Sequence, residues 1–312
     1  MKNPPINLIN GQIITLDPVL PTTNSIYINK GKIFSLGERI KNAKIIDLQG
    51  ATVVPGFIDA HFHLANLGKS LQELQLTGIS SVQSIIDAVV NKSKTFDKNN
   101  WILGRGWDQN IWGNSNFPAS SLLDEAVKNH PVVLTRIDGH AIWINKVVRD
   151  LIGYNENDNP LLGGEVINNC IFIDNAMDRV HKILPQPDEN TMLNYLINGC
   201  NYAIQYGITQ VHDAWQNESI IKGLESLDKN NNLPIRCYGM IDGKDSLLVD
   251  EWINRGKLFS DKITIRAVKA FIDGSLGSRG AALLDPYCDD PSNKGLILLT
   301  KDEFKLLSKK CY

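Results

Sequence analysis

The sequence has no long hydrophobic run, and neither sign of charge is in clear excess. No stretch of about 18 apolar residues occurs in the chain, so we expect no membrane-spanning helix. With 32 basic and 34 acidic residues the net charge is −2. No basic stripe offers the electrostatic attraction that nucleic-acid binding requires. The first residues lack the apolar core of a signal peptide.

Paired cysteines are also missing. The five cysteines are scattered, and none forms a Cys-x-x-Cys spacing. This distribution argues against a disulfide framework and against a cysteine zinc site, so we expect a reducing, cytoplasmic location. We expect most of the thiols to be small buried side chains. They are Cys170, Cys200, Cys237, Cys288 and Cys311.

Histidine is scarce, with six in the chain and none after His212, but two of them stand two residues apart. His61 and His63 follow an apolar run over Val53–Ala60, which is typical of a buried parallel strand. Residues i and i+2 of a strand face the same side, so this pair would present two imidazoles at the strand end. Two neutral imidazoles make half of a site for a divalent cation, with zinc the first candidate. Two surface histidines in a turn are the alternative.

The first 55 residues predict a small β unit. A strand over Ile6–Leu16, interrupted at Asn10, precedes a hairpin that turns at Gly31, where glycine accommodates a positive φ. A further strand is predicted over Ala43–Leu48.

Residues 66–200 are irregular and too long for a loop between barrel strands, so we expect an inserted α+β subdomain. Four of the six tryptophans fall here. We expect them to fill the core of the insertion, although Trp107 could line an apolar substrate pocket. His140 could touch substrate or be structural. Strands are predicted over Trp101–Leu103 and Val132–Arg136, and helices over Leu71–Leu76, Ser81–Asn91, Ser120–Lys128 with a serine cap, and Asp188–Tyr206.

From residue 201 onward, strands and helices alternate regularly, which is typical of a parallel sheet. Together with the strand before His61 we count about four core strands, whereas a complete (β/α)₈ barrel has eight. The strands are predicted over Ile208–Val211, Ile235–Met240 and Ile263–Ile272, and the helices over Ser219–Leu227, Ser246–Arg255 and Lys301–Lys310.

Three more candidate residues lie at or after the ends of these strands. Lys269 comes late in its strand, where a barrel side chain faces the active-site mouth; pairing with an acid such as Asp273 is the alternative. His212 follows a strand and could touch substrate, support the metal site or be structural. Arg279, in the glycine-rich segment Gly274–Gly280, could contact an anionic substrate group or form a surface ion pair.

Four segments together resemble the amidohydrolase superfamily. Pro55–His63 is similar to its first-strand signature, and three longer segments are similar to amidohydrolase family 3, the YtcJ-like proteins. The resemblance covers nearly all of the chain. It implies an α/β fold with a partial (β/α)₈ TIM-type barrel formed by residues 56–65 and 201–312, beside the small β unit and the inserted subdomain. The three longer segments are Trp101–Asp108, Arg136–Asn145 and Val268–Arg279.

The resemblance also implies a metal-dependent hydrolase acting on non-peptide C–N bonds of small molecules such as amides or formamides. Lys269 stands where many family members carry a lysine carboxylated by carbon dioxide, which can bridge two metal ions. One or two divalent ions, with zinc the first candidate, are therefore implied at His61, His63 and Lys269. The implied substrate-contacting residues are Trp107, His140, His212 and Arg279.

Family members take two further histidine ligands and a general-base aspartate from later barrel strands, and this sequence lacks them. We therefore expect an N-terminal fragment or one half of a split gene, with a separately encoded C-terminal half or a second copy of the chain as partner. The small β unit of the family is completed by C-terminal strands, so its edge is expected to be unpaired. The alternative is a catalytically inactive relative that binds a ligand or a partner.

Overall fold

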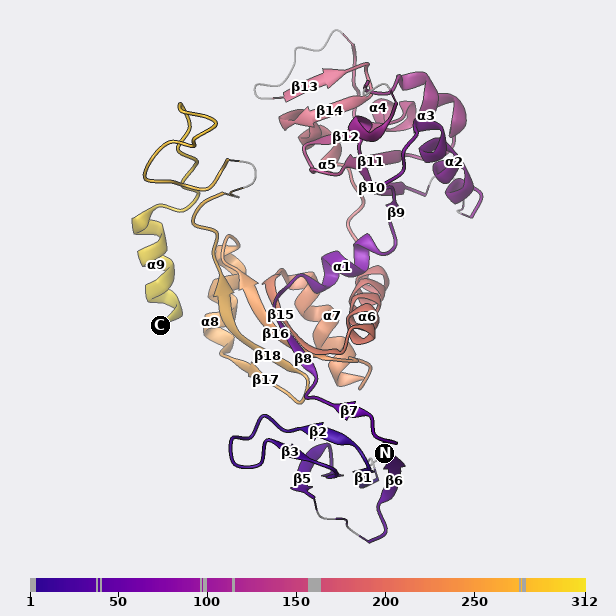
Figure 1. Cartoon of the computed structure of the whole chain (residues 1–312). Helices are drawn as coiled ribbons and strands as arrows, with labels where there is room; N and C mark the ends of the chain where they lie inside the picture. The colour runs from indigo at the N-terminus through magenta and orange to yellow at the C-terminus, as the bar shows by residue number, and fades with distance from the viewer. Residues whose placement is uncertain are drawn as a thin grey trace. The chain divides into compact units, whose positions relative to one another are not determined.

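The computed structural model describes residues 4–37, 39, 41–95, 97, 100–113, 116–156, 164–274, 276 and 279–312. They form a mixed α/β structure that divides into two compact units (Figure 1). The first unit comprises Met1–Asp59 and Gly207–Gln210, and the second comprises Ala60–Tyr206 and Val211–Tyr312. No helix in these described ranges is long and apolar enough to cross a bilayer.

Short strands make up the first unit. They are β1 (Ile6–Ile9), β2 (Gln12–Ile14), β3 (Thr22–Thr23), β4 (Ile26–Asn29), β5 (Lys32–Leu36), β6 (Lys44–Asp47) and β7 (Thr52–Val53). One sheet has the order β5-β4-β1-β6 and a second has the order β3-β2-β7. Lys30 and Gly31, between β4 and β5, have φ angles of 50° and 75°. Two successive positive φ angles are typical of a tight hairpin turn, so the predicted hairpin is confirmed.

A five-stranded sheet carries the predicted metal ligands, in the order β17-β18-β16-β15-β8. Its strands are β8 (Phe57–Phe62), β15 (Ile208–Gln216), β16 (Arg236–Asp242), β17 (Leu258–Phe259) and β18 (Ile263–Lys269). β16 and β18 are parallel, with Asp242 opposite Lys269, so both strands end at the same edge of the sheet. Helix α7 (Glu218–Lys229) follows β15 and α8 (Ser246–Arg255) follows β16, as the predicted alternation requires. The last helix is α9 (Lys301–Cys311).

Helix α1 (Leu64–Ser70) begins directly after His63 and packs on α6 (Glu189–Gln205). Figure 1 shows the two helices beside each other. Glycine on both helices permits the close approach. A Cβ atom at Gly68 would lie 1.7 Å from the carbonyl oxygen of Tyr195, and one at Gly199 would lie 2.6 Å from that of Leu64. This contact therefore fixes the helix that continues from the two histidines.

A six-stranded sheet in the order β13-β14-β12-β11-β10-β9 forms the other large part of the second unit. Its strands are β9 (Leu74–Gln75), β10 (Ile102–Trp107), β11 (Val132–Arg136), β12 (Ala141–Ile144), β13 (Gly164–Ile167) and β14 (Ile171–Asp174). The helices of this region are α2 (Val82–Ser93), α3 (Ser120–Ala126), α4 (Lys146–Leu151) and α5 (Asp178–His181), with 3-10 turns at Gln109–Ile111 and Asn175–Met177.

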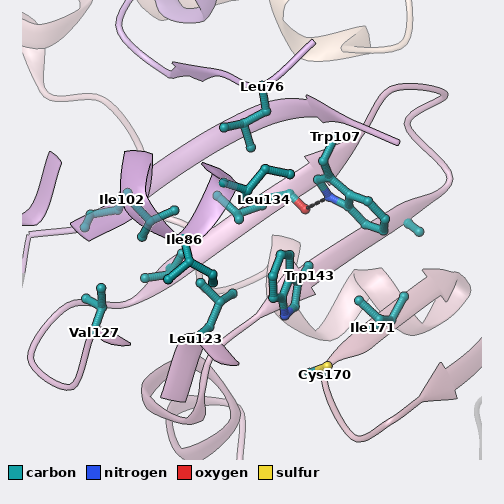
Figure 2. Close-up of a cluster of buried hydrophobic side chains, with 14 of the residues drawn as sticks. Leu76, Ile86, Ile102, Trp107, Leu123, Val127, Leu134, Trp143, Cys170 and Ile171 are labelled. Carbon is teal, nitrogen blue, oxygen red and sulfur yellow. Dashed lines mark hydrogen bonds between the residues drawn. The ribbon is translucent and has the colours of Figure 1, made fainter. Parts of the chain in front are cut away.

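Tryptophans form much of the core of this six-stranded sheet, as predicted. Trp107 and Trp143 are completely buried. Their ring centroids lie 6.3 Å apart at an interplanar angle of 73°, an edge-to-face contact, and Trp107 also stacks on Trp112. Figure 2 shows the indole N–H of Trp107 donating to the carbonyl oxygen of Leu134, at 2.7 Å. The hydrogen-bonding group of this buried ring is therefore satisfied inside the core.

Three local predictions were wrong. Leu71–Leu76 is not helical, because α1 ends at Ser70 and the chain then enters β9. Ser120 does not cap α3; it lies inside the helix, and Ala119 precedes it without a side-chain bond. β15 does not end before His212 but continues to Gln216, because its later residues still pair within the sheet.

The strand β8 was expected to be buried, and this expectation was also wrong. Phe57 and Ile58 expose 58% and 56% of their surface. β8 is the last strand of the five-stranded sheet, so within the described residues no further strand pairs with its outer edge. A parallel strand is buried only when layers cover both of its faces. The apolar run thus identified the strand correctly but not its burial.

Cysteine burial matches the expectation for three of the five thiols. Cys170, Cys200 and Cys237 are buried, whereas Cys288 and Cys311 are exposed.

Candidate metal centre

His61 and His63 lie at the end of β8 with their rings close together. The ring centroids are 5.4 Å apart and the ring planes meet at 79°. His61 is inside the strand, and His63 is the N-cap residue of α1, with φ and ψ angles of −133° and 83°. The predicted alternation therefore does bring two imidazoles to one strand end.

The surroundings of His63 suit a metal ligand. Its Nδ1 atom is buried and has no hydrogen-bond partner in the described part of the chain. Burial lowers the pKa of this imidazole, and the positive charges of His61 and Lys269 lower it further. A neutral ring with an unpaired nitrogen is the form that a divalent metal requires, whereas an unpaired buried nitrogen is costly without a ligand. The residues present therefore fit a metal-binding role.

Lys269 is the last residue of β18, and its positive charge contributes to the lowered pKa of His63. Its Nζ atom lies 5.1 Å from the ring centroid of Phe271. The carboxylate of Asp273, the alternative partner, instead accepts the backbone N–H of Ala282 at 3.0 Å. Lys269 thus shares one end of the sheet with the histidine pair. As an ammonium group it would repel a metal, so only a chemically modified or neutral form could be a ligand.

His212 lies within β15, the strand beside β8 in the sheet order. Its ring is half-buried and packs against Tyr238 of β16, with centroids 5.0 Å apart at 43°. The expected position at the strand end was wrong, because β15 continues from His212 to Gln216. The contact with Tyr238 gives the ring a packing partner and leaves its role in substrate binding a prediction.

Asp213 is a residue that the sequence reasoning missed. Its side chain is 1% exposed, and its Oδ1 atom accepts the backbone N–H of Leu64 at 3.1 Å. Its Oδ2 atom accepts the side-chain N–H of Gln216 at 3.0 Å. Burial raises the pKa of this carboxyl group to about 6, although both hydrogen bonds act in the opposite direction. Asp213 follows His212 directly in β15, so the two side chains point to opposite faces of the sheet. This alternation within an apolar strand was the signal available in the sequence.

Two candidate substrate residues belong to the six-stranded sheet and have structural partners there. Trp107 is part of the buried core, so we assign it to packing instead of a substrate pocket. The Nδ1 atom of His140 lies 2.9 Å from a carboxylate oxygen of Asp174, and both side chains are about half exposed. The structural alternative for His140 is thus the one its geometry favours.

Arg279 forms a surface ion pair. Its Nε and Nη2 atoms donate to the two carboxylate oxygens of Asp289 at 3.1 and 2.8 Å. This two-point contact uses the side of the guanidinium group that an anionic substrate would need. Of the predicted glycine-rich segment around it, Ser275, Gly277 and Ser278 lie outside the described residues.

The described imidazole, thiol and carboxylate side chains around the centre do not complete a metal site without further donors. Within the described ranges, no three His, Cys, Asp or Glu side chains come together in a metal-binding group. Zinc requires three or four protein or solvent ligands. His61 and His63 therefore provide part of a coordination sphere, with Lys269 and solvent as further candidates.

A sequence model of the amidohydrolase family matches residues 44–312, and the chain belongs to that family. It is 29% identical over 293 residues to the putative amidohydrolase YtcJ of Bacillus subtilis. The matched region covers 88% of this chain and 55% of that protein. It is 24% identical over 168 residues to the N-substituted formamide deformylase of Arthrobacter pascens, covering 51% of this chain and 31% of that protein.

A solved structure is similar over nearly the whole chain. The uncharacterized metal-dependent hydrolase from Pyrococcus horikoshii matches with a TM-score of 0.82 and 26% identity, over 98% of this chain and 62% of that one. The chain spans about half the length of two curated relatives that match most of its sequence. The family resemblance inferred from the four sequence segments is thereby confirmed.

Proposed function

We propose that this chain supplies part of the metal centre of a hydrolase that cleaves non-peptide C–N bonds in small molecules, with amides and formamides the first substrates to test. The observation that carries the proposal is the buried, unpaired Nδ1 atom of His63 beside the ring of His61. The names of the Bacillus and Arthrobacter relatives support amide or formamide chemistry. The name of the Pyrococcus protein supports metal dependence.

We propose further that the five-stranded sheet is the first part of a (β/α)₈-type barrel. Three features support this: the order β8-β15-β16-β18, the parallel pairing of β16 with β18, and the helices that follow β15 and β16. In such a barrel the site lies where the strands end at their carboxyl edge. His61, His63 and Lys269 all stand at that end of their strands.

The roles of these side chains follow from their protonation. His61 and His63 would hold the ion through neutral ring nitrogens, and zinc is the first candidate because imidazole is one of its usual ligands. Lys269 would join them after its neutral amine adds to carbon dioxide and loses a proton, which converts a cation into an anionic carbamate ligand. When bound, a divalent metal of this type lowers the pKa of a coordinated water and polarises a substrate carbonyl.

The remaining ligands and the general base would come from another polypeptide. A separately encoded second half is one source, and a second copy of the chain is another. Because no three-donor group occurs among the described residues, a relative that binds ligands without catalysis is the second candidate function.

Zinc binding tests the proposal before any substrate is known. The native chain and the His61→Ala/His63→Ala double variant should be titrated with zinc against a chromophoric chelator, with His140→Ala as the matched control. His140 is an exposed histidine paired with Asp174, so its loss should leave zinc affinity unchanged. Equal affinity in the native chain and the double variant would refute the metal centre.

Activity distinguishes the two candidate functions. A panel of amides and formamides should be assayed with the zinc-loaded chain, alone and with any polypeptide encoded downstream. Turnover that depends on both partners supports the hydrolase. Zinc binding without turnover in either setting would favour the non-catalytic relative.

A further inference from the structure

The helix that follows the two histidines begins without a cap of its own. His63 occupies the N-cap position of α1, and its side chain makes no hydrogen bond to the first turn. The first N–H groups of a helix lack partners within the helix, and the side chain at this position normally accepts from one of them. If the His63 ring binds a metal, it cannot also accept an N–H group of the first turn. The missing acceptor must come from elsewhere in the fold.

Asp213 of the neighbouring strand β15 is that acceptor. Its Oδ1 atom receives the N–H of Leu64, the first residue of α1, although 149 positions separate the two residues. Both side chains are buried. A carboxylate oxygen at the start of a helix also lies where the helix dipole favours negative charge. The bond therefore replaces the missing cap with one supplied from another strand.

The carboxylate of Asp213 is itself held in one orientation. Gln216 donates to its second oxygen, and the same amide nitrogen lies 3.5 Å from Sγ of Cys237 on β16. A Cβ atom at Gly239 would come within 2.1 Å of the Gln216 side-chain oxygen, so only glycine leaves room for this amide. Both oxygens of Asp213 are thus fixed, one by the helix and one by the sheet.

We propose that Asp213 is a positioning residue for the metal centre. By accepting the N–H of Leu64 it fixes the peptide that joins His63 to α1, and this peptide sets the direction of the His63 ring. The close packing of α1 on α6 through Gly68 and Gly199 holds the same segment from its other side. The inference rests on the proposed function, because it takes His63 as a metal ligand.

Two substitutions at Asp213 separate the hydrogen bond from the charge. Asp213→Asn keeps an oxygen that can accept from Leu64, and Gln216 can turn its amide to pair with the new NH₂ group. Asp213→Ala removes the acceptor. We expect the zinc dissociation constant to rise about 10- to 100-fold in the alanine variant, as for other residues that orient metal ligands. The asparagine variant should stay close to the native value.

Asn145→Ala is the matched control for general destabilisation. Asn145 is also fully buried, and its Oδ1 atom accepts the N–H groups of Val132 and Val148, the second of these in the first turn of α4. It does for α4 what Asp213 does for α1, but in the six-stranded sheet. Its loss should lower stability and leave zinc affinity unchanged. Equal loss of zinc affinity in both alanine variants would overturn the proposal.

Amide hydrogen exchange of Leu64, followed by NMR, reports on its hydrogen bond to Asp213 in the metal-free protein. Exchange should accelerate in Asp213→Ala and stay slow in Asp213→Asn. Accelerated exchange with native zinc affinity would overturn the positioning role and leave the metal centre intact. Unchanged zinc affinity in His63→Ala would instead refute the proposed function, and this inference with it.

Gln216→Met serves as the second variant if Asp213→Ala does not fold. It retains the Leu64 bond but removes the donor to Oδ2, so the carboxylate is held from one side only. We expect a smaller weakening of zinc binding than about tenfold. Native zinc affinity in this variant together with native exchange at Leu64 would contradict the two-sided hold on Asp213.

Discussion

The two large sheets of the second unit use apolar sequence in opposite ways. All four residues of β12 in the six-stranded sheet are buried, whereas none of the six residues of β8 in the five-stranded sheet is buried. The six-stranded sheet surrounds its tryptophans, whose rings pack in its core, and the indole N–H of Trp107 donates to Leu134. The five-stranded sheet instead carries imidazoles and a lysine at strand ends and a buried carboxylate within β15. The side chains of the six-stranded sheet pack into a core, whereas the five-stranded sheet places titratable side chains at the ends of its strands.

This contrast separates segments that look alike in sequence. Arg136–Asn145 and Pro55–His63 both combine apolar residues with histidine. In the first, Asn145 is a fully satisfied core amide and His140 pairs with Asp174. In the second, His63 keeps an unpaired buried nitrogen. Trp143 in the first segment also has an unpaired buried ring nitrogen, but an indole N–H can only donate, whereas the imidazole nitrogen of His63 can bind a metal.

Trp143→Ala should have the largest effect. Trp143 is fully buried in the six-stranded sheet, so its truncation should lower the free energy of unfolding by about 3–5 kcal/mol. Urea unfolding measures this, with Trp143→Phe as a milder control. Zinc affinity of the folded variant should not change. A parallel loss of zinc affinity would show that the two sheets do not have separate tasks.

Asp213 should make stability depend on pH. Its pKa is about 6 in the folded chain and 3.8 in its ordinary state, so the folded chain favours the neutral form. This favourable contribution is complete below about pH 4 and is lost as pH rises through 6. Two units of pKa correspond to about 3 kcal/mol. The native chain should therefore lose stability over this window relative to Asp213→Asn. Parallel pH curves for the two proteins would contradict the buried-carboxylate assignment.

Lys269→Met should weaken zinc binding by about tenfold or more, because removing a ligand exceeds the usual effect of removing a supporting residue. Lys244→Met is the matched control, since Lys244 lies 5.7 Å from the same Phe271 ring. Added bicarbonate should strengthen zinc binding in the native chain only. If the two methionine variants bind zinc equally well, Lys269 is not a ligand.

Arg279→Ala should have the smallest effect. The ion pair with Asp289 is exposed on both sides, and exposed pairs contribute little to stability. The midpoint of thermal unfolding and the zinc affinity should both equal the native values. A change in zinc affinity, absent from Asp289→Ala, would restore Arg279 as a residue of the site.

Local sequence patterns predicted the helices and strands of the five-stranded sheet better than the burial and hydrogen bonding of their residues. The alternation of strand and helix gave α8 with the observed bounds, and the His-x-His spacing gave two neighbouring rings. Burial of Phe57 could not be predicted, because it depends on which strands lie beside β8. The role of Asp213 depends on a hydrogen bond across 149 positions, and no local pattern contains that information.

The proposed centre is tested most directly by an anomalous difference map at the zinc absorption edge, from crystals of the chain grown with zinc. The account predicts one peak bonded to a ring nitrogen of His61 and of His63, at about 2.0–2.1 Å from each. The Nδ1 atom of His63, which is unpaired among the described residues, would then have a partner, either in its present position or after rotation of the ring. A zinc peak elsewhere, with the two imidazoles bonded only to protein or water, would contradict the account.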